Sequence, residues 1–110
     1  MKISVKKDFS PTPGGRWRRL GPNSGEEFYD SVLSKKFEEA VNNDEMLILD
    51  LDGVIGYPSS FIDQSFGTLS RRYGSKKVLK YLRFISEDQP SLVDIIIKNI
   101  KDPDNYEKNN

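Results

Sequence analysis

Apolar side chains recur along the chain in patterns that predict strands alternating with helices. Ile3 and Val5 alternate with polar residues over 2–7, which is the period of a half-buried strand. Residues 46–51 (MLILDL) are almost continuously apolar and bounded by turn residues, as expected of a central strand covered on both faces. Residues 78–85 predict one more strand.

Three helices are expected between and after these strands. The motif SGEE at 24–27 has capping-box spacing, and apolar positions then recur every three to five residues as far as Val41. A second helix fits residues 60–73, which are followed by a glycine placed to end it. The segment SEDQ at 86–89 repeats the capping-box spacing ahead of the apolar run LVDIIIKNI, which predicts the final helix.

The segment between the first strand and the first helix is rich in turn residues. Residues 10–25 contain three prolines and four glycines, which predicts a long loop or hairpin, with RWRRL at 16–20 able to pair as a short strand with Trp17 facing inward. The alternation indicates an α/β domain with a mostly parallel or mixed four-stranded sheet and about three helices. We expect residues 1–102 to form this single domain and the polar residues 103–110 to form a disordered tail.

Composition removes several classes of function. The chain has no cysteine and no histidine, which excludes thiol catalysis, disulfides, imidazole general bases and the usual zinc sites, and we expect no cofactor. No secretory signal or long apolar run is present, so a cytoplasmic protein without a membrane partner is expected.

Charge is balanced overall but uneven along the chain. Lysine plus arginine and aspartate plus glutamate both number 17, which gives no global reason to bind nucleic acid. Residues 1–20 nevertheless carry six basic side chains against one acid, and residues 71–83 carry six with none. Solvated surface is the simpler interpretation of both clusters; binding of phosphate, nucleic acid or an acidic partner is the alternative.

The sequence LDLDGVI at 49–55 resembles the D-x-D-G motif of haloacid-dehalogenase phosphatases. That resemblance implies Asp50 as nucleophile and Asp52 as acid or base, with Mg²⁺ between them. Only 58 residues follow Asp52, which leaves little chain for the lysine and acidic motif that complete such a site. A buried Asp50 instead needs backbone amides or an arginine to offset its desolvation, and the natural candidates are Arg16, Arg18 and Arg19.

The following turn also resembles that of STAS-domain anti-sigma-factor antagonists, in which D-S-S-G begins a helix. Without gaps, Pro58, Ser59, Ser60 and Phe61 fall on these four positions, so the aspartate and the glycine are replaced. The resemblance implies phosphorylation within the serine pair, with Ser59 at its first position. A phosphate at a helix N-terminus is favoured electrostatically, whereas simple helix capping is the alternative role for both serines.

A longer resemblance joins two motifs. GPNSGEEF at 21–28 and DLDGVIGYPSSFIDQSFGTL at 50–69 are similar to a STAS-like domain family of unassigned function, with the patterns G-P-x-S-G-E-x-F and D-x-D-G-x-x-G-Y-x-S-S-F. Such domains occur in bacteria and their phages, often beside or fused to histidine-kinase-like ATPases. The resemblance implies a regulatory function.

These observations favour a non-enzymatic regulatory or interaction module over the phosphatase. The expected partner is a protein, most plausibly a histidine-kinase-like ATPase, that contacts or modifies Tyr57, Ser59, Ser60 and Phe61. Loops after parallel strands gather at one edge of the sheet, so Arg16, Arg18, Ser24 and Gly25 could surround an anion there.

Overall fold

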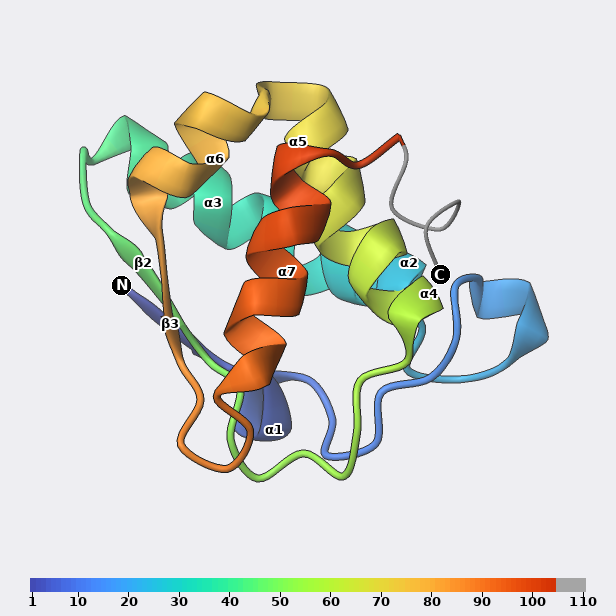
Figure 1. Ribbon diagram of the computed structural model, residues 1–110. Coiled ribbons are helices and arrows are strands. Elements are labelled where there is room, and N and C mark those ends of the chain that lie inside the picture. Colours follow the sequence, from blue (N-terminus) through green and yellow to red (C-terminus); the bar gives the residue numbers. More distant parts are fainter. Residues whose placement is uncertain (105–110) are drawn as a thin grey trace.

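Three parallel strands form the sheet in the computed structural model, which describes residues 1–104 (Figure 1). They are β1 (Lys2–Ser4), β2 (Leu47–Asp50) and β3 (Leu82–Ile85), in the order β1-β2-β3. Ile3 lies in register with Leu49, which lies in register with Phe84. The fold is therefore α/β with a parallel sheet, as predicted, but with three strands in these residues and not four.

Five helices, besides a short 3-10 turn, are present in residues 1–104. Two of them are continuous segments with a π-helical turn in the middle, because the residues at their internal junctions keep helical backbone angles. The elements are α1 (Val5–Asp8), η1 (Arg18–Leu20), the continuous helix α2 (Gly25–Phe28), η2 (Tyr29–Leu33) and α3 (Ser34–Asn42), the continuous helix α4 (Ser59–Ile62), η3 (Asp63–Gly67) and α5 (Thr68–Tyr73), then α6 (Ser75–Tyr81) and α7 (Ser91–Lys101).

The helices cover one face of the sheet, and Figure 1 shows them on one side of the strands. Leu47 and Leu49 in β2 are fully buried, whereas Ile48 and Asp50 are only half-buried because they point to the other face. The prediction that this strand is central is confirmed. The expectation that both of its faces are covered is wrong.

Aromatic rings from segments far apart in the sequence fill the core between the helices and the sheet. Phe28 on α2 stacks on Phe61 of α4 with ring centroids 5.5 Å apart, and the rings of Phe9 and Phe66 also contact Phe28. Phe66 also meets Phe84 of β3 edge-on. The helices that carry the two sequence motifs are thus fixed to each other and to the sheet.

Two of the expected strands are shorter than predicted because helical turns take part of each run. β1 ends at Ser4, whose side chain accepts a hydrogen bond from the amide of Lys7 at 3.2 Å and so begins α1. In the run 78–85, the first four residues belong to α6, and the strand begins only at Leu82. Short apolar runs fit either period, and here local capping and packing decide.

The other differences concern turns. RWRRL does not pair as a strand: η1 forms there and Trp17 is half-buried. The predicted cap at 86–89 does not begin a helix, because Ser86 Oγ donates to the carbonyl of Gln89 at 2.7 Å and α7 starts two residues later, at Ser91. Of the tail predicted at 103–110, residues 105–110 lie outside the described part of the chain.

Candidate functional site

The loops that follow the parallel strands gather at the carboxyl ends of these strands, at the bottom of Figure 1. The loop after β2 and the first two residues of α4, residues 51–60, form the segment that we call the serine rim. It contains the last three residues of the D-x-D-G motif, the tyrosine and both serines of the predicted site. In α/β proteins this edge of a parallel sheet is where ligands and partners commonly bind.

Asp52 joins the serine rim to the loop after β3. Its two carboxylate oxygens accept hydrogen bonds from the amides of Glu87 and Asp88 at 3.1 and 3.0 Å. Asp88 Oδ2 in turn accepts from the amide of Gly53 at 3.0 Å, and Gly53 has a positive φ of 79° that favours glycine. The second aspartate of the D-x-D-G motif therefore holds two neighbouring loops together.

Asp50 also has a local structural role. Its Oδ1 accepts from the amide of Asp52 at 3.1 Å, and its Oδ2 lies 3.7 Å from Lys2 Nζ. The expected arginine partners are wrong, because Arg16 and Arg18 bind other aspartates. This geometry gives the phosphatase interpretation no support, and in residues 1–104 no group of three or more carboxylates is arranged to hold a metal ion.

Tyr57 fastens the serine rim to the end of β2. Its hydroxyl donates to the carbonyl of Leu51 at 2.9 Å, and its ring centroid lies 6.1 Å from that of Phe61. Burial, followed by the negative charges of Asp50 and Asp52, raises the pKa of the Tyr57 hydroxyl well above its usual range. Tyr57 is therefore a neutral anchor that keeps the turn in one shape.

The two serines occupy the first two positions of a continuous helix that runs to Tyr73. Pro58 is the N-cap residue, and neither serine side chain caps the helix. Ser59 is exposed and Ser60 is half-buried. Both hydroxyls were predicted to lie at a helix start, and they do, with Ser59 accessible from solvent.

A groove lies beside the serines on the same rim. It has a volume of about 360 Å³, and its lining residues are Thr12, Pro13, Ile55, Gly56, Tyr57 and Pro58. Ile55 is 86% exposed although its amide is fixed by a hydrogen bond to the carbonyl of Pro11 at 3.0 Å. A large apolar side chain is thus held in solvent at the mouth of a groove.

The second motif, GPNSGEEF, packs against the helix that the serines begin. Ser24 is fully buried and its hydroxyl accepts from the amide of Glu27 at 3.0 Å, which confirms the predicted cap. Gly25 sits where a Cβ would lie 2.7 Å from the carbonyl oxygen of Phe61, a backbone atom that cannot yield. Its amide donates to the carbonyl of Gly15 at 2.8 Å. The motif therefore sets the distance between α2 and α4.

An aspartate that the sequence reasoning missed lies at the centre of an ionic cluster. Asp63 is only 5% exposed, and its carboxylate binds Arg16 Nη1 at 2.6 Å, Arg71 Nη2 at 2.7 Å and Asn99 Nδ2 at 3.2 Å. Burial alone raises the pKa of Asp63, but the hydrogen bonds from Arg16, Asn99 and Arg71 outweigh it and lower the pKa below the ordinary value. The absence of a side chain at Gly67 makes space for this carboxylate, because a Cβ there would lie 2.7 Å from Asp63 Oδ1.

This cluster joins the long loop, η3 and α7. The signal that could have pointed to Asp63 is a single acid among the apolar residues of FIDQSF. Arg71 is one of the residues of the basic cluster at 71–83, and it also donates to the carbonyl of Pro103 at 3.0 Å. Arg71 of the basic cluster therefore has a structural role and is not simply a solvated surface charge.

The four residues suggested for an anion already have partners within the chain. Arg16 binds Asp63, the guanidinium of Arg18 donates to Asp30 Oδ2 at 2.8 Å, and the polar groups of Ser24 and Gly25 are used as described above. Anion binding by this set stays a prediction. No helix in residues 1–104 has the length and apolar character needed to cross a bilayer.

Comparison with known proteins agrees with the two sequence motifs. No curated protein and no solved structure matches the chain. A family model described as a STAS-like domain of unknown function (DUF4325) matches residues 24–92, more than half of the 110 residues, and this range contains the D-x-D-G turn, both serines and Asp63. The chain belongs to this family of STAS-like domains.

Proposed function

We propose that this domain is a non-enzymatic regulatory module that binds a protein partner through the serine rim. The observation that carries the proposal is Ile55, which is 86% exposed yet fixed through its own amide. Holding a large apolar side chain in water costs free energy that a binding partner recovers by burying it. Loops fixed by a rigid scaffold are the usual location of such contacts.

The groove beside Ile55 gives a partner somewhere to insert a side chain. Its walls are mainly apolar residues and backbone, among them Pro13 and Pro58. Anchors at protein interfaces are typically large side chains that fill a preformed pocket of this kind. The rim is preformed because Asp52 and Tyr57 fasten it at both sides.

Ser59 is positioned to regulate this contact. It is exposed and directly follows Pro58 of the groove. A phosphate there would add nearly two negative charges next to an apolar surface, which opposes docking of an apolar partner by desolvation. The helix N-terminus tolerates the same charge, so phosphorylation would change binding and leave the fold intact.

The proposed partner is a histidine-kinase-like ATPase, the class that the family resemblance suggests. Capture of such an ATPase by immobilised domain, quantified by mass spectrometry, tests this. Ile55→Asp should abolish capture and Ser59→Asp should weaken it. The matched control is Leu20→Asp, which introduces the same charge in place of another exposed apolar side chain, because Leu20 is 70% exposed. That variant should bind the ATPase as the wild-type chain does.

The proposed binding surface and the proposed regulation can each be rejected by one result. Equal capture by the Ile55 and Leu20 variants would show that the rim is not the contact surface. Unchanged capture by both Ser59→Asp and Ser59→Ala would separate the serine from regulation, even if the rim binds.

A further inference from the structure

The outer edge of β3 is open to another strand. Within residues 1–104 the sheet ends at β3, and the amide of Leu51 donates to the carbonyl of Ile85 at 2.9 Å. Alternate residues of a parallel strand bond the same neighbour, so the groups of Ile85 face β2 and the N–H and C=O of Phe84 point away from it. Phe84 therefore presents a donor and an acceptor to a further strand.

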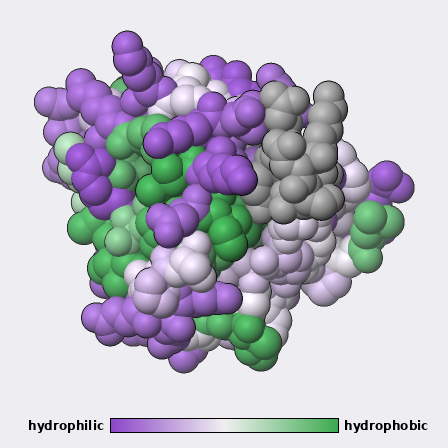
Figure 2. Space-filling view, in the orientation of Figure 1, coloured by the Kyte–Doolittle hydropathy of each residue, from purple (hydrophilic) through white to green (hydrophobic). Residues whose placement is uncertain are grey.

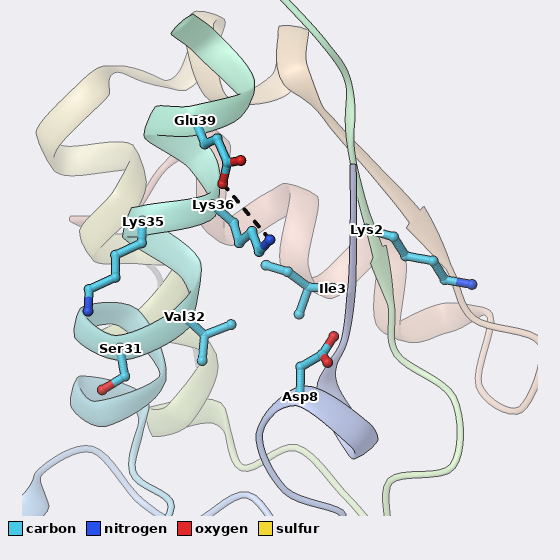
Figure 3. A pocket seen from close by; sticks show the side chains of 8 residues that line it. All are labelled: Lys2, Ile3, Asp8, Ser31, Val32, Lys35, Lys36 and Glu39. Atoms are coloured by element: carbon cyan, nitrogen blue, oxygen red, sulfur yellow. Dashed lines mark ion pairs between the residues drawn. The ribbon is translucent and has the colours of Figure 1, made fainter. Parts of the chain in front are cut away.

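At the opposite edge of the sheet, β1 is partly protected. At β1 the carboxylate of Asp8 accepts a hydrogen bond from the outward-pointing amide of Ser4 at 2.8 Å. Figure 3 shows the continuous helix of η2 and α3 running beside this strand. The groove between the helix and the strand has a volume of about 350 Å³. On the helix side, Lys36 and Glu39 form an ion pair with their charged atoms 3.9 Å apart. Protecting an edge with a charge and a neighbouring element is a usual defence against strand addition.

The protection at β3 is also partial. Arg83 Nη1 donates to the carbonyl of Leu82 at 2.7 Å, which engages one edge acceptor. The backbone groups of Phe84 have no such side-chain partner among the hydrogen bonds of residues 1–104. Pairing with another strand is therefore expected to centre on Phe84.

An apolar surface adjoins this edge. Figure 2 shows hydrophobic side chains gathered over β3 and α7, which lie on the near side of the molecule in Figure 1. Ile85 is 36% exposed and Ile95 43% exposed, and Phe84, Val93 and Ile97 are half-buried. A surface helix normally keeps its apolar residues on the core side, and α7 has more of them than one face can bury.

The charged residues around this surface are arranged so that two copies of it, placed antiparallel, are complementary in charge. Lys80 and Arg83 precede Phe84, whereas Glu87 and Asp88 follow it. On α7 the sign order is again split, with Asp94 in the first turn and Lys98 in the last. An antiparallel arrangement of two identical surfaces therefore places basic groups opposite acidic groups at both ends.

We propose that β3 pairs antiparallel with β3 of a second copy of this chain, about a two-fold axis at Phe84. The outward N–H and C=O of each Phe84 would bond those of the other, and the two three-stranded sheets would join into one. The α7 helices would lie on the same side of the joined sheet and cover their apolar surfaces. Self-complementarity of this kind is what an isologous dimer requires.

This arrangement brings Lys80 and Arg83 of each copy to the same end of the paired strands as Glu87 and Asp88 of the other copy. Sedimentation velocity of the full chain from micromolar to submillimolar concentration is the test. Glu87→Lys replaces attraction by repulsion at two symmetry-related places and should weaken the dimer about tenfold or more. Lys80→Glu should do the same, because it removes the net positive charge that faces Glu87 and Asp88 of the other copy.

The matched control is Lys35→Glu, the same charge change on α3, which should leave the dimer unchanged. Hydrogen exchange of the Phe84 amide gives a second readout that does not depend on the variants, because its protection should rise with protein concentration. A wild-type chain that stays monomeric would overturn the proposal and leave this surface to another occupant. A dimer that keeps its wild-type affinity in both Glu87→Lys and Lys80→Glu would also overturn it.

Discussion

Replacing Asp63 by asparagine should destabilise the fold far more than a chemically identical change at an exposed ion pair. The carboxylate of Asp63 accepts charge-assisted or amide hydrogen bonds from Arg16, Arg71 and Asn99 at 2.6, 2.7 and 3.2 Å. Bonds to charged groups contribute about 1.5–3 kcal/mol each. Loss of one partner from a buried ion pair costs about 3–5 kcal/mol.

The expected loss of stability is at the lower end of this range because water can reach both arginines. The side chain of Arg16 is 20% exposed and that of Arg71 is 37% exposed, so both recover part of their hydration when Asp63 loses its charge. We expect Asp63→Asn to lower the free energy of unfolding by about 3 kcal/mol. For a domain of this size the unfolding midpoint should fall by about 12 °C.

Asp30→Asn is the matched control. Asp30 also binds an arginine, Arg18, at 2.8 Å, but about half of each side chain is exposed. That pair should contribute less than about 1 kcal/mol. Urea unfolding of both variants measures the difference, and equal losses at the two positions would refute the role assigned to burial of Asp63.

The pH dependence supplies an independent check. The pKa of Asp63 is lowered in the folded state, so its contribution is fully present above the unfolded-state pKa near 3.8 and is lost as pH falls through the folded-state value. The stability difference between wild type and Asp63→Asn should therefore be constant near neutral pH and shrink below about pH 4. A difference that stays constant into acid would contradict the ionic account.

Three further changes test other parts of the fold, the first two by urea unfolding and the third by hydrogen exchange. Gly25→Ala should cost about 1–3 kcal/mol because its Cβ meets backbone 2.7 Å away, whereas Gly56→Ala, which meets nothing within 4 Å, should change little; equal effects would reject the close helix contact. Tyr57→Phe should cost about 1 kcal/mol and reduce the loss of stability above about pH 10, since the folded state holds the phenol proton more tightly than the unfolded state does; an unchanged alkaline profile would argue against this anchor. Asp52→Asn should speed hydrogen exchange at the amides of Glu87 and Asp88; unaltered exchange would show that the loops are held otherwise.

The elements that sequence reasoning predicted correctly are those with a local signal. The cap at Ser24, the central strand β2 and the helix ending at Gly74 each depend on residues that are neighbours in sequence. The elements predicted wrongly depend on competition between such signals. Ser4 caps a helical turn where alternation suggested that the strand continues, and the Ser86 hydroxyl bonds the carbonyl of Gln89 where the capping-box spacing suggested a helix start.

The candidate site was predictable only in part. The position of the serines at a helix start follows from the YPSSF turn, but the roles of the aspartates depend on residues 35 or more positions away. Asp52 bonds the amide of Glu87, and Asp63 bonds Asn99, and no pattern within a short window contains both members of either pair. The open edge of β3 likewise depends on how many strands the sheet has.

The central claim, that a partner docks on the serine rim, is tested most directly by the affinity of the partner ATPase for three forms of the domain. Titration of wild type, Ile55→Asp and Leu20→Asp, with equal unfolding midpoints confirmed beforehand, gives the answer. The account predicts that binding is lost with Ile55→Asp and retained with Leu20→Asp. Wild-type affinity in the Ile55 variant would contradict it.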